Sequence, residues 1–419
     1  MDFPKPRQER ETSLLMYYLD VVFPLQYLPH ERTCVGKREW LLTVLTSARP
    51  TYYATLCLAL LHKESSASSS TSEQAAVWKR EKTYYYILAL QESQKLLGGL
   101  DKTSGMIRLK GTVIALACML QLSSHLTRGD WRVHLLAAKT LIPVLIDGWS
   151  TALQSGPPAS SIWCELNESD FDSDGEFIQT SLSFEYIAAL RFLSNFLATI
   201  GILSCISVGT ASPFEDYSYL MNQPGLMQLD ELLGCRNWAM LTILEVGKLD
   251  RWKRQEQEND RLSLKTLARR SMEIEDMVAD ELQRSPTPET LGDLITHIYA
   301  ASITTYLHTV VSGLNPNLVE VQESVSTTVL LLEKLPDLQA VVSIIWPLAV
   351  TGCMALPRQR EFFRVTLRSY SSTWSSLRKY DGVTEVLEQA WKKQELKTAE
   401  GAMKWEELMD FQGIPVLLI

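Results

Sequence analysis

Three aspartates and a glycine have the spacing of a calcium-binding loop. Asp170, Asp172, Asp174 and Gly175 occupy positions 1, 3, 5 and 6 of such a loop, where alternating oxygens surround the ion and glycine permits the sharp turn. Position 12, which must supply a bidentate glutamate, is Ser181. Because that ligand is missing, we interpret the segment as an acidic linker, and a calorimetric titration showing submillimolar calcium affinity would overturn this interpretation.

A second candidate is a serine that could act as a nucleophile. Gly148-Trp149-Ser150-Thr151-Ala152 is close to the G-x-S-x-G elbow, in which a strand, a turn and a helix hold the serine hydroxyl clear of the backbone. Here the preceding residues 135–147 have a helical pattern, and alanine stands where the final glycine is needed. We therefore interpret this serine as the end of a helix.

The histidines lack the spacing of a metal site, because none is three or four positions from another, as H-E-x-x-H requires. His297 and His308 share one face of a predicted helix, but a rise of about 1.5 Å per residue puts them roughly 16 Å apart, too far to hold one ion. The other histidines are His30, His62, His125 and His134.

The seven cysteines are equally scattered. The closest two, Cys34 and Cys57, are 23 positions apart, whereas structural zinc sites take tight pairs such as C-x-x-C. We interpret the cysteines as reduced core thiols of an intracellular protein. Neither a Walker loop nor a G-x-G-x-x-G fingerprint occurs. We therefore assign no catalytic, cofactor-binding or metal-binding residue, expect no cofactor, and expect that the protein is not an enzyme.

The composition is that of a globular protein with an acidic surface. Of the 419 residues, 46% are hydrophobic and 21% are charged, which favours a large packed core over global disorder. The net charge of −9 disfavours direct binding to nucleic acid phosphates. Residues 1–11 contain no apolar run of a secretory signal, so we expect the chain to stay inside the cell.

The elements that carry these residues are predicted to be helices. Apolar stripes with helical spacing recur along the chain, and sustained apolar/polar alternation typical of strands is absent. Four stripes are Leu15, Tyr18, Leu19, Val22 and Phe23, ended by Pro24; Leu109, Val113, Leu116, Ala117 and Leu120; Leu291, Leu294, Ile295, Ile298 and Tyr299, with Thr287 as N-cap and Pro288 as first residue; and Phe363, Leu367, Tyr370, Trp374 and Leu377.

We therefore predict an all-α fold, a large multi-helix array with no significant sheet. Residues 1–11 are expected to be a disordered N-terminus, and residues 12–419 to form a single helical domain. Flexible loops are expected near 64–73, which is rich in serine, and near 151–176.

A charged run from Lys248 to Arg284 contains nine basic and nine acidic side chains, which cancel. Such a balanced run is typical of a solvated helix face with ion pairs four residues apart. The alternative that we keep open is a surface for a protein partner.

Two long stretches lack charge. Residues 338–357 include Trp346-Pro347, and residues 192–214 are interrupted by serine, threonine and proline. Their polar residues favour buried helices over membrane spans, and the proline in the first stretch predicts a kinked core helix.

Several segments together resemble the large C-terminal regulatory domain of fungal zinc-cluster transcription factors. Together they extend over almost the whole chain. The set of segments is therefore more specific to this family than any single segment is. The segments are Leu14 to Leu28, Trp40 to Thr43, Tyr52 to His62, Leu232 to Cys235, Ile243 to Val246 with Leu249, the Trp346-Pro347 tract, Arg358 to Leu367, and Trp391.

The resemblance implies an all-helical regulator of transcription that works in the nucleus, in such families commonly for a secondary-metabolite gene cluster. Members of the family carry an N-terminal six-cysteine zinc cluster, for which residues 1–12 have no room. The resemblance therefore implies a regulator or co-regulator that binds a DNA-binding zinc-cluster protein, as part of a homo- or heterodimer and with a small-molecule effector as a further partner. No basic cluster longer than a pair marks a nuclear import signal, so a partner could carry the chain into the nucleus.

Two alternatives stay open at this point. The first is an enzyme or small-molecule carrier on the same helical body, with a buried pocket near Trp346 and His297 or His308. The second is a longer gene product with a zinc cluster upstream, which sequencing of the transcript's 5′ end would reveal.

Overall fold

The computed structural model of the chain describes residues 7–26, 39–66, 72–100, 102, 105–125, 131–147, 184–212, 215–222, 227–336, 343–374, 379–395, 404–411 and 414–415. The first half of the described chain consists of α1 (Arg7–Tyr17), the π-helix η1 (Tyr18–Val22), α2 (Phe23–Gln26), α4 (Glu39–Ser47), α5 (Arg49–Ser66), α6 (Ser72–Leu100), α7 (Gly105–His125) and α8 (Trp131–Lys139). The second half consists of α10 (Phe184–Val208), the 3₁₀ helix η3 (Ser218–Asn222), α11 (Asp230–Leu233), α12 (Asn237–Glu258), α13 (Leu264–Arg284), α14 (Leu291–Ser312), α15 (Val319–Leu332), α16 (Ile345–Cys353), α17 (Pro357–Trp374), α18 (Lys379–Glu395) and α19 (Trp405–Met409).

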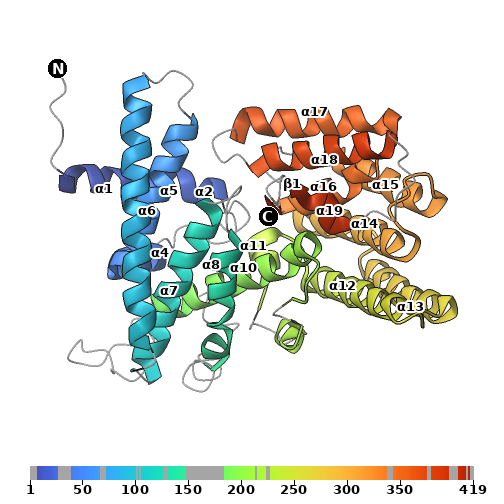
Figure 1. Cartoon of the computed structure of the whole chain (residues 1–419), viewed down its shortest axis with the longest axis horizontal. Helices are drawn as coiled ribbons and strands as arrows, with labels where there is room; N and C mark the ends of the chain where they lie inside the picture. The colour runs from blue at the N-terminus through green and yellow to red at the C-terminus, as the bar shows by residue number, and fades with distance from the viewer. Residues whose placement is uncertain are drawn as a thin grey trace.

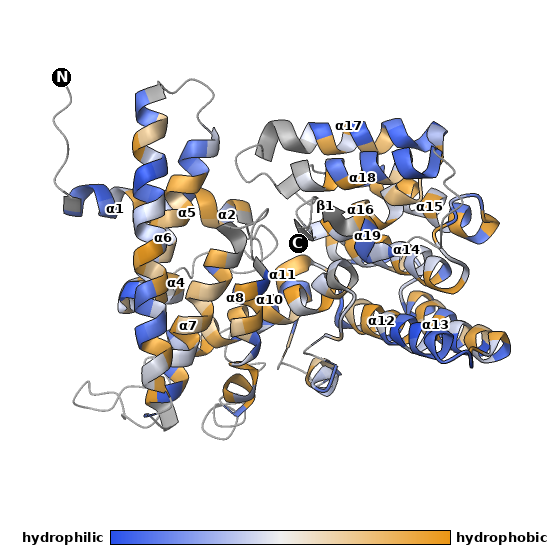
Figure 2. Ribbon diagram, viewed as in Figure 1, coloured by the Kyte–Doolittle hydropathy of each residue, from blue (hydrophilic) through white to orange (hydrophobic). Residues whose placement is uncertain are grey.

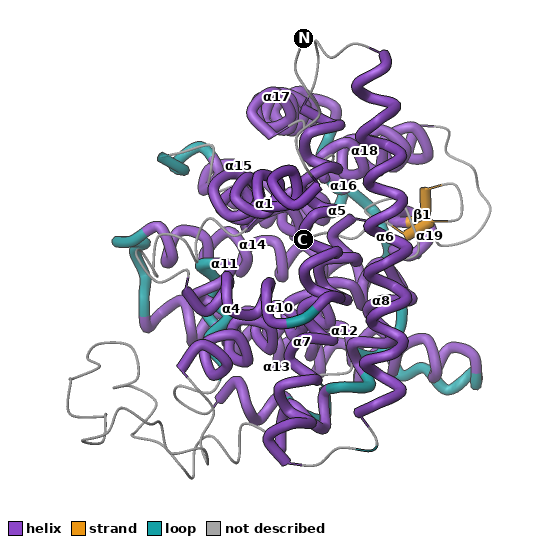
Figure 3. Tube along the Cα trace, turned by 90° about the vertical axis from the view of Figure 1, so that its left-hand side faces the viewer, coloured by secondary structure: helices purple, strands orange, loops and turns teal. Residues whose placement is uncertain are grey.

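The predicted all-α class is confirmed, as the view in Figure 3 shows. The only strands in the described part of the chain are β1 (Asp410–Phe411) and β2 (Ile414–Pro415), which form one antiparallel pair of two residues each. A pair this short has no hydrophobic face of its own. The fold is therefore held together by helix packing.

The helices form two groups on either side of α10, with α1 to α8 on the left and α12 to α19 on the right of Figure 1. Helix α10 packs against α4 and α7 in the first group and against α12 and α19 in the second. One continuous cluster of buried apolar side chains extends from Leu14 in α1 to Leu408 in α19. Helix α10 therefore joins the cores of both groups.

This central position explains why α10 is so apolar. Within it, Glu185–Cys205 has a mean hydropathy of 1.6 and would be long enough to cross a membrane, yet 94% of its most apolar window is buried inside the body. A core helix surrounded by other helices is expected to be apolar on all sides. Figure 2 shows the contrast with helices at the edge, such as α13, which alternate hydrophobic and hydrophilic residues.

The start of the chain differs from the prediction at residues 7–11. Helix α1 begins at Arg7, so residues 7–11, which were expected to be disordered, are helical, while residues 1–6 lie outside the described part. Glu11 accepts a hydrogen bond of 3.0 Å from the Tyr85 hydroxyl, and Arg10 pairs with Glu81 at 2.6 Å. These contacts with α6 hold the first turns of α1 in place.

The helix also continues beyond the predicted stop at Pro24, because the turn before that proline is a π-helix. The Phe23 N–H bonds to the Tyr18 carbonyl, five residues earlier. A wider turn relieves the clash that a proline ring makes with the carbonyl four residues before it. The wider turn at residues 18–22 therefore accommodates Pro24 within the helix, which ends at Gln26.

The predicted loops fall largely on residues outside the described part. Helix α5 extends to Ser66 and α6 begins at Ser72, so the two ends of the predicted loop at 64–73 are helical. Lys82 on α6 pairs with Glu64, which fastens the end of α5. The predicted loop at 151–176, the calcium-like loop and Ser150 lie outside the described residues.

The N-cap of α14 is Thr290 rather than the predicted Thr287. The Thr290 hydroxyl accepts a hydrogen bond from the Asp293 N–H at 3.1 Å, and the Asp293 carboxylate accepts one from the Thr290 N–H at 3.2 Å. Arg236 also reaches Asp293, at 2.5 Å. This reciprocal capping box, strengthened by the cation of Arg236 at the N-cap of α12, outweighs the Thr287-Pro288 signal just before it.

Asp293→Asn tests the charge in this cap. Burial alone would raise the pKa of Asp293, but the hydrogen bonds from Thr290 and the charge of Arg236 outweigh it and lower the pKa. A lowered pKa adds stability above the unfolded-state pKa, and that stability is lost as the pH falls through the folded-state pKa. We expect the variant to lose about 1 kcal/mol of unfolding free energy at pH 7, and the difference from the wild type to shrink only as the pH falls below about 4 and through the lowered folded-state pKa, as measured by urea unfolding.

Glu323→Gln is the matched control, because Glu323 is exposed on α15 and forms no ion pair within the described residues. It should change stability by less than about 0.5 kcal/mol at both pH values. An equal loss for both variants, or a loss for Asp293→Asn that does not depend on pH, would show that the charge in the cap contributes nothing.

Candidate interaction site at helices α16 to α18

The Trp346-Pro347 tract forms a short buried helix and not the long kinked one that the sequence predicted. Helix α16 begins at Ile345, which places Pro347 in its first turn, and all nine of its residues are buried. Proline is tolerated there because the first N–H groups of a helix have no partner within the helix. Residues 337–342 lie outside the described part.

Trp346 is a core residue. Its indole is fully buried and stacks on Tyr299, with ring centroids 5.7 Å apart and planes 4° from parallel. Tyr306 meets the same indole edge-on at 6.2 Å. The indole Nε1 has no hydrogen-bond partner in the described structure. Aromatic packing rather than polar contact therefore holds the tryptophan.

The two histidines of the alternative pocket face away from this tryptophan. His297 Nε2 lies 2.8 Å from the Ser285 carbonyl, and His308 Nδ1 lies 3.8 Å from Glu275. Both contacts are with α13 and its C-cap, whereas Trp346 contacts the opposite side of α14, about half a turn away at roughly 100° per residue. The structure does not bring these residues together.

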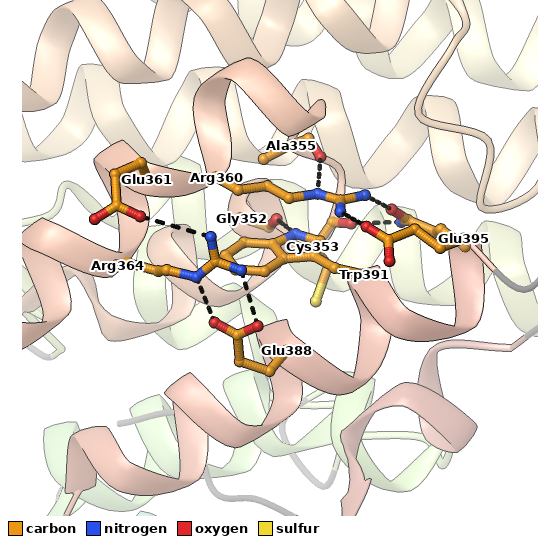
Figure 4. A network of polar contacts seen from close by, with 10 residues as sticks. Gly352, Cys353, Ala355, Arg360, Glu361, Arg364, Glu388, Trp391 and Glu395 are labelled. Atoms are coloured by element: carbon orange, nitrogen blue, oxygen red, sulfur yellow. Dashed lines mark hydrogen bonds and ion pairs between the residues drawn. The ribbon is translucent and has the colours of Figure 1, made fainter.

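Side chains from α18 close the C-terminal end of α16 (Figure 4). The Trp391 indole N–H donates to the Gly352 carbonyl at 2.8 Å, and the Gln394 amide donates to the Cys353 carbonyl at 2.7 Å. The last carbonyls of a helix have no partner within the helix and require such donors when they are buried. Trp391 and Gln394 therefore fix α18 to α16.

Two arginines from α17 cover the Trp391 ring. The guanidinium carbon of Arg364 lies 4.8 Å from the ring centroid and that of Arg360 lies 5.5 Å from it. Arg364 also forms a bidentate pair with Glu388, at 2.6 and 2.9 Å, and its hydrogen bonds lower the pKa of Glu388. Arg360, which is buried, pairs with Glu395. Cations over an indole and paired with carboxylates make a rigid polar layer.

The outer edge of this layer carries exposed charges of both signs. Arg368 on α17 is 69% exposed and approaches Glu361 at 3.4 Å, and Glu361 also approaches Arg364 at 3.6 Å. Mixed charges around a fixed aromatic suit the rim of a protein interface, whereas a nucleic acid surface would need an excess of cations. The spacing of Arg360, Arg364 and Arg368 at every fourth residue is the sequence signal that could have located this layer.

The described residues offer binding groups rather than reactive ones. They contain no group of three or more histidine, cysteine, aspartate or glutamate side chains that could hold a metal ion. The five described cysteines are free thiols, four of them in the core as predicted and Cys205 half-buried, and burial raises the pKa of Cys57 and of Cys118 to about 12. Thiols with such pKa values stay protonated and unreactive at neutral pH.

A cavity lies elsewhere, between α4, α10 and α11. Its volume is about 10 Å³, about the space of one water molecule. Arg191, whose side chain is 7% exposed, lines it and pairs with Glu231 at 2.5 Å, while Asn195 donates to the Gln228 carbonyl at 3.0 Å. Burial raises the pKa of Glu231 although the Arg191 hydrogen bond opposes this. These contacts anchor α11 to α10. The cavity is too small for a drug-sized ligand.

Gly352→Ala tests how closely α16 packs against α17 and α18. A Cβ at this position would lie 2.9 Å from both terminal methyl carbons of Leu387 and 3.1 Å from a Phe363 ring carbon. We expect a net loss of about 1–2 kcal/mol in unfolding free energy, because overpacking outweighs the better helix propensity of alanine. Thermal unfolding followed by circular dichroism measures this loss.

Gly247→Ala is the control, because Gly247 lies within α12 and a Cβ there would lie 3.5 Å from the Arg251 side chain, an ordinary contact. This variant should gain about 0.5–1 kcal/mol. A gain of stability at both positions would mean that α16 is less tightly packed than the structure shows.

Comparison with known proteins identifies the family. Residues 13–419 match the family described as the fungal specific transcription factor domain. The chain is 77% identical to the trichothecene biosynthesis transcription regulator TRI10 of Fusarium sporotrichioides and 55% identical to TRI10 of Trichoderma arundinaceum, over the full length of both proteins in each case. It is 26% identical to the ustiloxin B cluster transcription factor ustR of Aspergillus flavus, over 98% of this chain and 73% of that protein. No solved structure matches the chain. The chain therefore belongs to the fungal-specific transcription factor domain family.

Proposed function

We propose that the chain regulates transcription of a secondary-metabolite gene cluster, specifically one for trichothecene biosynthesis, from within the nucleus. The observation that carries this proposal is the 77% identity to a trichothecene regulator over the whole of both chains. A second regulator of the same name is similar over its full length, and the more distant relative ustR also serves a metabolite cluster by its name.

We further propose that the chain acts by binding another protein, a DNA-binding zinc-cluster transcription factor. The net charge of −9 opposes approach to DNA, and no two cysteines in the chain lie closer than 23 positions, so these 419 residues offer no pair of the kind a zinc cluster uses. The rigid mixed-charge layer on α17 and α18 supports a protein as the binding partner.

The experiment combines gene disruption with purification of the tagged chain from its own nuclei. Disruption should change the level of the cluster transcripts, and the tagged chain should recover a zinc-cluster factor. Deleting that factor should then remove the chain from the cluster promoters in chromatin immunoprecipitation. Chromatin association that persists after each recovered candidate is deleted would contradict binding through a partner.

Arg368→Glu tests whether the α17–α18 layer contacts that partner. Reversing an exposed charge at an interface rim places like charges together, so we expect about tenfold weaker capture of the partner in a titration. The fold should be unaffected, because Arg368 is 69% exposed. Lys95→Glu is the matched control, since Lys95 is 71% exposed and lies on α6 in the other group of helices. Equal capture by both variants would place the partner elsewhere.

A further inference from the structure

Helix α13 has one face that nothing in the described structure covers. Its inner face packs on α12 and α14 through residues spaced as one helical stripe, which are Leu267, Ser271, Ile274 and Val278. On its outer side Met272 is 60% exposed, and Leu264 (74%) and Met277 (45%) lie on the two flanks between the inner and the outer side. Figure 1 shows α13 at the edge of the molecule. The outer side is therefore open to a second molecule at Met272.

The charges on this outer face change sign along the helix. Lys265 and Arg269 lie in the first half, and Asp276 and Asp280 lie in the second half, with Met272 between them. At about 100° per residue these five positions fall within a stripe of roughly 80°. Arg269 pairs with Glu273 within the helix, but Lys265, Asp276 and Asp280 form no ion pair within the described residues.

This order of charges is the reverse of what helix stability favours. The N-terminal end of a helix dipole favours acidic residues and the C-terminal end favours basic ones. The first turn of α13 contains no acidic residue and has Lys265 instead, while Asp280 lies near the other end. The charge pattern is therefore not explained by stabilisation of α13 itself. It indicates that these charges contact a second molecule.

The pattern matches a second copy of the same helix. Lys265 lies as far before the midpoint between Met272 and Glu273 as Asp280 lies after it, and Arg269 and Asp276 are related in the same way. A two-fold rotation about that midpoint sets an antiparallel copy beside the first, with each cation opposite an anion. A parallel copy would put like charges together, so the pattern selects the antiparallel arrangement.

We propose that α13 is the interface of a homodimer, in which the outer faces of two copies pack antiparallel around Met272. Four ion pairs, two for each half of the helix, lie on either side of Met272, which is 60% exposed. The helix is 21 residues long, about 31 Å, so a single helix face buries less than a standard interface and the dimer is weak and concentration-dependent. This inference does not depend on the proposed function, because it concerns self-association alone.

The test uses charge reversal in the full-length chain. An acidic variant carries Lys265→Glu and Arg269→Glu, and a basic variant carries Asp276→Lys and Asp280→Lys. In sedimentation velocity over micromolar to submillimolar concentrations, the wild type should dimerise, and each variant alone should dimerise at least tenfold more weakly. An equimolar mixture of the two variants should form a heterodimer, and the chain with all four changes should recover the homodimer.

Two controls separate this interface from general charge effects and from misfolding. Glu320→Lys with Glu323→Lys, on the exposed side of α15, should leave self-association unchanged. The thermal unfolding midpoints of all variants should stay close to the wild type, since every altered side chain is exposed. Orientation is tested by oxidation, because positions 269 and 276 lie opposite each other in the antiparallel dimer, so Arg269→Cys mixed with Asp276→Cys should give a heterodisulfide far faster than either variant alone gives a homodisulfide.

A wild type that stays monomeric over the whole concentration range would overturn the proposal. So would dimerisation that both charge variants retain, or a mixture that forms no heterodimer, because each outcome removes the charge pairing on which the antiparallel arrangement depends.

Discussion

Replacing Trp346 with alanine is expected to lower the free energy of unfolding by about 3–5 kcal/mol, the range for a large aromatic side chain removed from a packed core. The indole is fully buried between Tyr299 and Tyr306, so its removal leaves a cavity that neither neighbouring ring can fill without losing its other contacts. The Tyr299 hydroxyl, for example, donates to the Ser343 carbonyl at 2.9 Å. Such a loss is a large part of the roughly 5–15 kcal/mol that stabilises a typical protein.

Trp346→Phe separates packing from hydrogen bonding. Because the indole Nε1 has no partner in the described structure, phenylalanine breaks no hydrogen bond and should lose only about 1–2 kcal/mol for the smaller volume. Val365→Ala, at a half-exposed position on α17, should change stability by less than about 0.5 kcal/mol. Urea unfolding followed by circular dichroism measures all three, and a loss below about 1 kcal/mol for Trp346→Ala would contradict the packing of α14 against α16.

Glu231→Leu is expected to destabilise the junction between α10 and α11 by about 2–3 kcal/mol. The change takes the Glu231 carboxylate away from the Arg191 guanidinium, which is only 7% exposed and keeps its hydrogen bond to the Gln228 side chain. A fully buried pair that loses one partner costs about 3–5 kcal/mol, and the smaller value applies here because Glu231 is a quarter exposed and already partly solvated.

The double variant Arg191→Met with Glu231→Leu should recover most of that loss, because it removes the buried cation as well. Glu245→Leu is the control, since Glu245 forms an exposed pair with Lys248 and should cost less than about 0.5 kcal/mol. If the double variant were as unstable as Glu231→Leu alone, the loss would come from packing and not from the buried charge of Arg191.

The sequence predicted best what depends on local periodicity. Leu109, Val113 and Leu116 recur every third or fourth residue, and they are buried on α7 as predicted. No information from distant residues is needed to place such a stripe. The all-helical class followed from the repetition of this pattern along the chain.

Helix ends were harder to predict, because they depend on groups far away in the sequence. Thr287 and Thr290 are both reasonable caps, and Arg236, more than fifty positions earlier, completes the cap at Thr290. Proline in the first turn of a helix and proline within a helix look alike in a sequence, which is why Pro347 was expected to cause a kink.

The polar parts of the interaction site could not be predicted for the same reason. Arg364 and Glu388 are 24 positions apart, and Arg191 and Glu231 are 40 apart. Periodicity identifies which side of a helix is apolar but not which charged residue on another helix lies opposite. These contacts could not be predicted because their partners lie far apart along the chain, whereas the residues of an apolar stripe are close together in the sequence.

Fluorescence anisotropy of labelled promoter DNA tests most directly whether the chain works through a DNA-binding partner. At physiological salt the purified chain alone is expected to show no preference for a cluster promoter over a scrambled sequence, while adding the zinc-cluster factor recovered with it should give a larger complex on the promoter only. Binding of the promoter by the chain alone, about 10³-fold or more tighter than the scrambled sequence, would contradict regulation through a partner.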